Sequence, residues 1–132
     1  MKKGVCFLFV IALLVSSFAI ADYQMMVFKS KTGQYFPTTK IKTASTGTSG
    51  QVDNYFCSGN HSMYYQIRKT NGVEASNYVI FKGTGSRPLT YKRDGYGESM
   101  GRYGYSYRLR VAHRSQCTCN GGEIDVMIDY RP

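Results

Sequence analysis

The chain has 132 residues, with 17 Lys and Arg against 8 Asp and Glu, 12 Tyr and no Trp. This length allows one small domain and excludes a multidomain enzyme. The net charge of +9 favours a partner that carries negative charge.

The first 21 residues have the three parts of a secretory signal peptide. Lys2 and Lys3 give the charged start, residues 5–15 are apolar, and Ala19-Ile20-Ala21 fits a signal peptidase site. We expect cleavage before Asp22, which leaves 111 residues with a net charge of +7 in a secreted or periplasmic protein. The apolar run is shorter than the roughly 20 residues that span a bilayer, so no transmembrane segment is predicted.

The predicted mature chain contains three cysteines, Cys57, Cys117 and Cys119. We expect a disulfide between Cys57 and either Cys117 or Cys119, which would stabilise the fold by roughly 3 to 4 kcal/mol. The third cysteine would be buried or would join two chains. Because Cys-x-Cys with His61 and His113 lacks the ligand spacing of a tetrahedral zinc site, we expect no metal and no cofactor.

Short alternating runs bounded by turn residues recur about every ten residues after the signal, and no helical period is present. The pattern predicts a single all-β domain over residues 22–132, an antiparallel sandwich or partly open barrel of about seven or eight short strands. The predicted strands are 23–29, 35–43, 52–57, 62–69, 76–82, 89–92, 103–113 and 123–130. Residues 44–51, rich in Ser, Thr and Gly, are expected to form a flexible loop.

The last two predicted strands are expected to pair as a hairpin through an Asn120-Gly121 turn, with Val111 opposite Tyr130. His113 and both late cysteines would then point inward. The apolar face would hold Tyr103, Tyr105, Tyr107, Leu109, Val111, Ile124, Val126, Ile128 and Tyr130. The other face would be solvated and charge-balanced, with Arg108, Arg110, Arg114 and Arg131 beside Glu123, Asp125 and Asp129.

Six of the seven net positive charges fall in residues 82–114. Within this region, residues 91–105 alternate aromatic, charged and glycine residues, which predicts a long surface loop of the kind that often binds ligands. The predicted ligand-binding residues are Tyr91, Arg93, Tyr96, Arg102, Tyr103 and Tyr105. The alternative is that Tyr96 and Tyr103 cover the edge of the core while the glycines make turns.

These features predict a binding protein that contacts glycans or an anionic cell surface, because tyrosine rings stack on sugars and cationic side chains attract anions. Export argues against nucleic acid as a partner. One alternative is a secreted cytotoxic or antimicrobial protein, including a toxin that acts on a host. Another is an exported inhibitor that blocks a partner enzyme with its basic loop. A tyrosine-rich sheet also has apolar area for a homo-oligomer.

The cytotoxic alternative includes a metal-free ribonuclease, which needs a general base, a general acid and a cation beside the phosphate. The candidate catalytic residues are His61, Glu74, Arg102 and His113. Their spacing does not indicate that they converge, and the chain has no G-x-S-x-G elbow, H-E-x-x-H helix or Walker loop. Binding is therefore favoured over catalysis.

Overall fold

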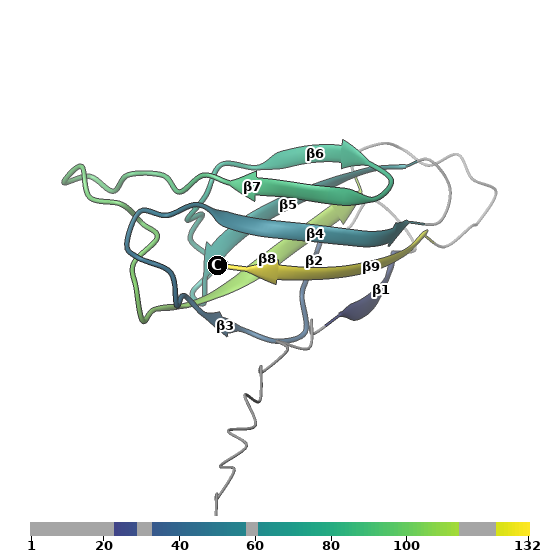
Figure 1. Cartoon of the computed structure of the whole chain (residues 1–132), viewed down its shortest axis with the longest axis horizontal. Helices are drawn as coiled ribbons and strands as arrows, with labels where there is room; N and C mark the ends of the chain where they lie inside the picture. Colours follow the sequence, from purple (N-terminus) through teal and green to yellow (C-terminus); the bar gives the residue numbers. More distant parts are fainter. Residues whose placement is uncertain (1–22, 29–32, 58–60, 114–123) are drawn as a thin grey trace, which may run out of the picture.

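The computed structural model of the chain describes residues 23–28, 33–57, 61–113 and 124–132, which are all-β and contain no helix (Figure 1). The prediction of an antiparallel all-β fold is confirmed. The strands are β1 Gln24–Phe28, β2 Gln34–Tyr35, β3 Lys40–Ile41, β4 Gly50–Cys57, β5 Ser62–Lys69, β6 Val79–Lys82, β7 Gly85–Leu89, β8 Ser106–His113 and β9 Ile124–Arg131.

The strands form two sheets that pack face to face (Figure 1). The four-stranded sheet has the order β1-β9-β4-β7, and the five-stranded sheet has the order β2-β8-β5-β6, with β3 also paired to β8. Consecutive strands β6 and β7 belong to different sheets, and the chain turns between them at Gly83 and Gly85, both with positive φ. Glycine adopts this conformation without the steric cost of a Cβ atom.

The predicted hairpin between the last two strands is wrong in its pairing. β8 pairs with β5, from Met63 opposite His113 to Lys69 opposite Tyr107, whereas β9 pairs with β1 and β4. A strand buries the same alternate residues whether its partner lies beside it or across a sandwich, so the alternation alone could not distinguish the two. Residues 114–123, with both late cysteines, lie outside the described residues.

The alternation itself places most of the predicted apolar face correctly. Buried in the core are Tyr107, Leu109, Val111, Ile124, Val126, Ile128 and Tyr130. The prediction is wrong for Tyr103 and Tyr105, which are exposed because β8 begins only at Ser106. His113 points inward as predicted and is buried.

Two buried tyrosines of the core form hydrogen bonds between the two sheets through their hydroxyl groups. The Tyr130 hydroxyl donates to the carbonyl of Tyr107 in the opposite sheet at 2.8 Å. The Tyr65 hydroxyl accepts a hydrogen bond from the side-chain amide of Asn54 across the same interface, also at 2.8 Å. These bonds offset the cost of burying a phenol and tie the two sheets together at defined points.

Several element bounds differ from the prediction for local reasons. The predicted strand 35–43 is two short strands, β2 and β3, on either side of Pro37, which cannot donate to a ladder. Residues 44–49 form a loop, as expected, whereas Gly50 and Gln51 already belong to β4. Among the described residues, no helix is long and apolar enough to cross a membrane.

Candidate functional site

Residues 91–105 connect β7 to β8 and project from one end of the sandwich, at the left of Figure 1. The first part folds back as a small hairpin. The amide of Asp94 donates to the carbonyl of Glu98 at 2.8 Å, and the amide of Met100 donates to that of Lys92 at 2.9 Å. Gly97 completes the tip with a φ of 81°.

Asp94 organises the tip of this hairpin. One of its carboxylate oxygens accepts hydrogen bonds from the amides of Tyr96 at 2.9 Å and Glu98 at 3.0 Å, and the other pairs with Arg102 at 3.0 Å. The bonds from Glu98 and Tyr96, together with the Arg102 charge, hold the pKa of Asp94 below its ordinary value. The carboxylate is therefore a fixed acceptor for the turn and for Arg102.

The second part of the loop is anchored from two sides. From the core, the Tyr107 hydroxyl accepts a hydrogen bond from the amide of Arg102 at 2.8 Å and donates one to the carbonyl of Met100 at 2.6 Å. From the neighbouring loop, Gly47 donates to the carbonyl of Gly101 at 2.9 Å. Tyr103 is held there too, because its amide donates to the Thr46 hydroxyl at 3.1 Å.

Five of the six predicted ligand-binding residues lie on the surface of this loop, namely Arg93, Tyr96, Arg102, Tyr103 and Tyr105. The side chains of Tyr96, Tyr103 and Tyr105 are 93%, 65% and 56% exposed. Tyr96 and Tyr103 therefore do not cover the edge of the core, which was the alternative interpretation.

Tyr91 has a different environment from the other five. Its side chain is 8% exposed and packs in the core, with its ring centroid 5.5 Å from that of Tyr107. The ammonium group of buried Lys42 lies 4.9 Å from the same centroid. Gly101 lies directly against the ring, where an added Cβ atom would be 2.2 Å from a ring carbon. Tyr91 supports the loop from below and is not available to a ligand.

Of the four candidate catalytic residues, the structure brings together two. The rings of His61 and His113 meet edge to face, with centroids 5.2 Å apart. Glu74 lies opposite Arg68, at the far end of β5 from His61. Seven residues of extended strand separate His61 from Arg68, which corresponds to about 20 Å. The amide of Arg102 is hydrogen-bonded to the hydroxyl of Tyr107. Tyr107 and His113 are six residues apart on β8, which also corresponds to about 20 Å. The four residues do not form one constellation.

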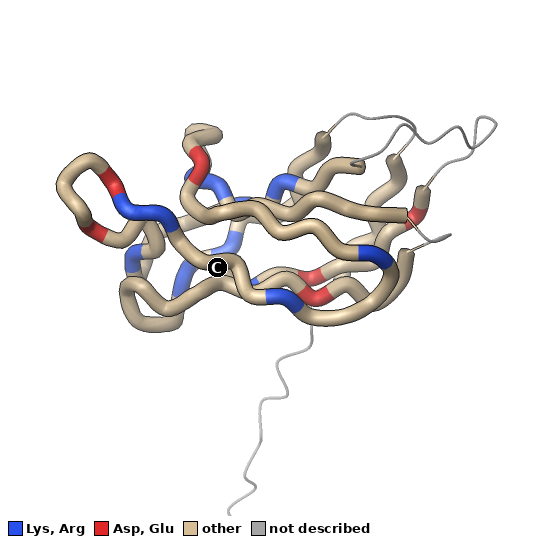
Figure 2. Tube along the Cα trace, turned by 90° about the horizontal axis from the view of Figure 1, so that it is seen from above, with Lys and Arg blue, Asp and Glu red and all other residues tan. Residues whose placement is uncertain are grey.

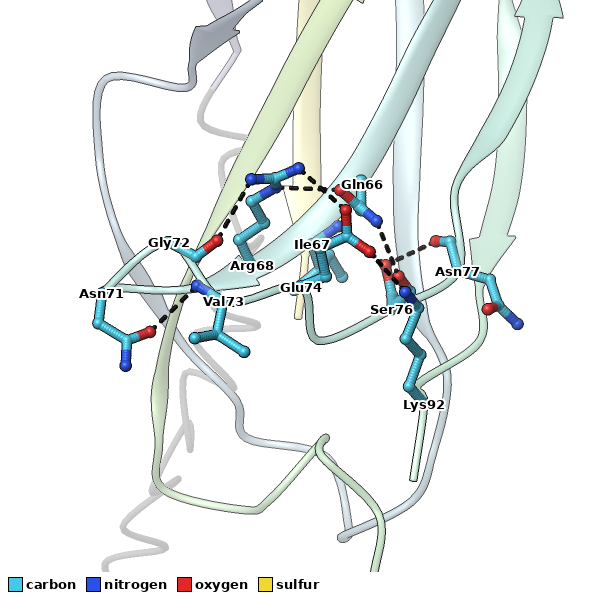
Figure 3. A network of polar contacts seen from close by, with 10 residues as sticks. All are labelled: Gln66, Ile67, Arg68, Asn71, Gly72, Val73, Glu74, Ser76, Asn77 and Lys92. Atoms are coloured by element: carbon cyan, nitrogen blue, oxygen red, sulfur yellow. Dashed lines mark hydrogen bonds and ion pairs between the residues drawn. The ribbon is translucent and has the colours of Figure 1, made fainter. Parts of the chain in front are cut away.

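Glu74 is instead part of a polar network on β5 and the turn that follows it (Figure 3). Its carboxylate pairs with Lys92 at 2.5 Å and with Arg68 at 3.2 Å. The hydrogen bond from Lys92 is the main reason why the pKa of Glu74 lies below its ordinary value. Arg68 also donates to the side chain of Gln66 and to the carbonyl of Gly72. This arrangement suits a structural ion pair better than a general acid.

The predicted charge-balanced face is also wrong in its pairing. Arg108 and Arg110 belong to the five-stranded sheet, whereas Asp125 and Asp129 belong to the four-stranded sheet. Among the described residues, Asp129 pairs with Lys40, and Arg131 pairs with Asp53 at 2.7 Å. Arg114 and Glu123 lie outside the described residues. Lys and Arg residues occur along the loop and on strands of both sheets (Figure 2). Among the described residues, the basic residues that pair with a carboxylate are Lys40, Arg68, Lys92, Arg102 and Arg131.

Metal binding finds no support in the described ranges, which contain no group of three or more His, Cys, Asp or Glu side chains placed to hold an ion.

Comparison of the chain with protein-family models, curated proteins and solved structures finds no match. We therefore infer the function of this chain from its own residues.

Proposed function

We propose that the chain is a binding protein that contacts a glycan or an anionic cell surface through Arg93, Tyr96, Arg102, Tyr103 and Tyr105, here called the Tyr/Arg loop. The observation that carries the proposal is the combination of a hydrogen-bonded loop backbone with highly exposed tyrosine side chains. Because the backbone is held before binding, little conformational entropy is lost when the ligand is bound.

The side chains of the Tyr/Arg loop suit this ligand class chemically. Tyrosine offers an apolar ring face and a polar hydroxyl, which match the apolar and hydroxylated sides of a sugar. The pair with Asp94 orients the guanidinium of Arg102. The guanidinium of Arg93 is held by the carbonyl of Gly97 at 2.6 Å. Both arginines keep further N–H donors for a carboxylate, sulfate or phosphate group.

The test is capture on a glycan array by the purified chain and by a Tyr96→Ala/Tyr103→Ala variant. We expect the variant to lose at least tenfold in apparent affinity, since each removed ring contributes about 1 kcal/mol or more. Tyr23→Ala/Tyr55→Ala is the matched control, because it also removes two exposed tyrosines, but from outside the Tyr/Arg loop. Tyr55 is on β4, and Tyr23 directly precedes β1. Equal capture by wild type and loop variant would overturn the proposal.

The proposal includes export and a disulfide from Cys57. Cys57 ends β4 and lies opposite Val126, near the start of β9. The residues that flank the segment with Cys117 and Cys119 are His113 and Ile124, at the same end of the sandwich. This proximity supports a bond from Cys57 to one of the two. Peptide mapping of the secreted protein without reduction would identify the bonded peptides, and detection of Cys57 as a free thiol would contradict the bond.

A metal-free ribonuclease is a second candidate, favoured by the contact between His61 and His113. Two imidazoles at this distance can act as acid and base on one phosphate when a substrate lies against both. The informative variant is His61→Ala, because His113 is buried and its loss would disturb the core. RNA cleavage that persists in His61→Ala, or its absence from the wild type, would remove this candidate.

Self-association has a candidate surface on the outer face of the four-stranded sheet. Met25, Met127 and Phe56 lie side by side across β1, β9 and β4, and Met25 and Phe56 are about half exposed. Exposed apolar rows of this kind are typical of interfaces. Light scattering would show a dimer that dissociates in Phe56→Glu. A monomeric wild type at high concentration would contradict the proposal.

A further inference from the structure

A second cationic surface lies on the outer face of the five-stranded sheet, on elements that do not belong to the Tyr/Arg loop. Arg68 on β5 is directly opposite Arg108 on β8, and Gln66 is opposite Arg110. Successive side chains of a strand alternate between its faces, so these residues share the side that faces away from the core. We call Tyr35, Tyr64, Arg68, Arg108 and Arg110 the arginine face.

Aromatic rings orient the guanidinium groups of the arginine face. The guanidinium carbon of Arg108 lies 3.9 Å from the ring centroid of Tyr35, and that of Arg110 lies 5.9 Å from the centroid of Tyr64. Tyr64 is itself stacked on Tyr78, with centroids 5.0 Å apart and planes at 25°. Cation–π contacts of this type hold a guanidinium in place without using its N–H donors.

Arg110 is also fixed from the side of β2. Gly33 lies so close that an added Cβ atom would be 2.7 Å from a terminal nitrogen of Arg110. The missing side chain at this position therefore makes room for the guanidinium. Together with the Tyr64 ring, it places Arg110 in a defined position beside Arg108, about 7 Å along the same strand.

Among the described residues, the charges of Arg108 and Arg110 have no carboxylate partner. The Nε atom of Arg108 is buried and has no hydrogen-bond acceptor among the described residues. None of the ion pairs within the described part of the chain includes Arg108 or Arg110. Arg68 differs, because Glu74 already neutralises it. Arg108 and Arg110 lie two positions apart on β8, and neither charge is paired with a carboxylate of the described residues, so this part of the sheet attracts an anion.

We propose that the arginine face binds an acidic polysaccharide, whose sulfate or carboxylate groups accept hydrogen bonds from Arg108 and Arg110. Planar guanidinium groups bind such oxyanions through two parallel N–H donors. A single-stranded nucleic acid fits less well, because it needs open ring faces for its bases. Here Tyr64 lies between Tyr78 and Arg110, and Arg108 covers one face of Tyr35.

The experiment compares binding of the purified chain to immobilised heparin, a sulfated polysaccharide, with binding of two single variants. Arg110→Gln removes an oriented donor from the arginine face, and we expect about tenfold weaker binding. Arg87→Gln is the matched control, because Arg87 also lies over a ring, that of Phe81, but is on β7. The control loses the same charge and should keep nearly full affinity.

A double variant and a loop variant make the outcome specific to this surface. Arg108→Gln/Arg110→Gln should weaken heparin binding further than Arg110→Gln alone, and Arg110→Lys should retain only part of the wild-type affinity, since lysine keeps the charge but not the fork. Tyr96→Ala/Tyr103→Ala should leave heparin binding intact, which separates this proposal from that of the Tyr/Arg loop.

Three results would overturn the proposal. The first is wild-type affinity for heparin in the double variant when circular dichroism shows it to be folded. The second is an equal loss in Arg87→Gln and Arg110→Gln, which would indicate attraction by net charge alone. The third is tighter binding of a single-stranded oligonucleotide than of heparin at the same salt concentration, which would assign the arginine face to nucleic acid.

Discussion

The hydroxyl of Tyr107 donates a hydrogen bond to the carbonyl oxygen of Met100 at 2.6 Å. The same hydroxyl accepts a bond from the amide of Arg102, so one buried side chain binds the backbone on both sides of Gly101. The ring of Tyr107 lies in the core, and its polar end holds the loop that carries the exposed tyrosines. Tyr107 therefore connects the core directly to the candidate site.

Replacement of this hydroxyl tests the connection. Tyr107→Phe keeps the ring but leaves the amide of Arg102 and the carbonyl of Met100 without their partner. We expect the free energy of unfolding to fall by about 1 to 3 kcal/mol, and hydrogen exchange to accelerate at residues 100–102. Chemical denaturation and exchange measurements check this. Tyr105→Phe is the control, since Tyr105 is exposed, and an equal loss in the control would contradict the assigned role.

Gly101 gives a second test of the same support. An added Cβ atom would lie 2.2 to 2.5 Å from ring carbons of buried Tyr91, so Gly101→Ala must displace the ring or the loop. We expect a destabilisation of about 1 to 3 kcal/mol in denaturant unfolding. Gly95→Ala is matched to it, because Gly95 lies in the same loop with open space around its Cα. Similar stability of the two variants would show that the loop adapts without cost.

Gly33→Ala separates the position of Arg110 from the stability of the fold. The added methyl group meets the flexible end of the arginine side chain, so we expect little change in the unfolding temperature. Arg110 would move from its place beside Tyr64, and heparin binding should weaken several-fold. Affinity measurements on Gly33→Ala and wild type decide the matter. Unchanged affinity would mean that the position of Arg110 is not required.

Asp53 predicts a pH dependence of stability. Burial by itself would raise the pKa of Asp53, but hydrogen bonds from Ser86, Gln51 and Arg131 and the charge of Arg131 hold it below the ordinary 3.8. As the pH falls, Asp53 therefore takes up a proton at a higher pH in the unfolded chain than in the folded one. The contribution of this carboxylate to the free energy of unfolding is fully present well above pH 4. It is lost as the pH falls through the lowered pKa of Asp53 in the folded protein.

The matching variant is Asp53→Asn, measured by urea unfolding between pH 7 and pH 3. We expect the variant to be less stable than wild type at pH 7, since Arg131 loses its charged partner. The difference between the two proteins should narrow toward pH 3. A constant difference across this range would show that the carboxylate does not couple stability to pH.

The sequence predicts which residues are buried better than it predicts which strands are neighbours. Alternation from Tyr107 to Val111 and from Ile124 to Tyr130 identifies the inner faces correctly. Pairing between β8 and β5, or between β9 and β4, depends on contacts between distant residues that leave no local signal. The prediction ends a strand at residue 82, before the turn at Gly83, but it starts the next strand at residue 89, whereas β7 spans Gly85–Leu89.

The candidate site shows the same division. Composition indicates the exposed loop, and Tyr96, Tyr103 and Tyr105 are exposed as a contact surface requires. Composition could not show that Tyr91 packs under the loop, because its burial depends on the close approach of Gly101. The arginine face was hidden because Arg68 and Arg108 are 40 positions apart and become neighbours only through β5 and β8.

The pairing of β1 with β9 has a consequence for synthesis. Gln24 lies opposite Ile128, so the first described strand finds its partner only after the 103 residues between them have been made. β9 also lies between β1 and β4, so β1 has no partner and β4 lacks one of its two neighbours until β9 has paired with them. Until then both neighbours expose edges that can pair with other chains. A chain that stops before residue 124 should therefore aggregate, because β1 and β4 lack the strand that lies between them.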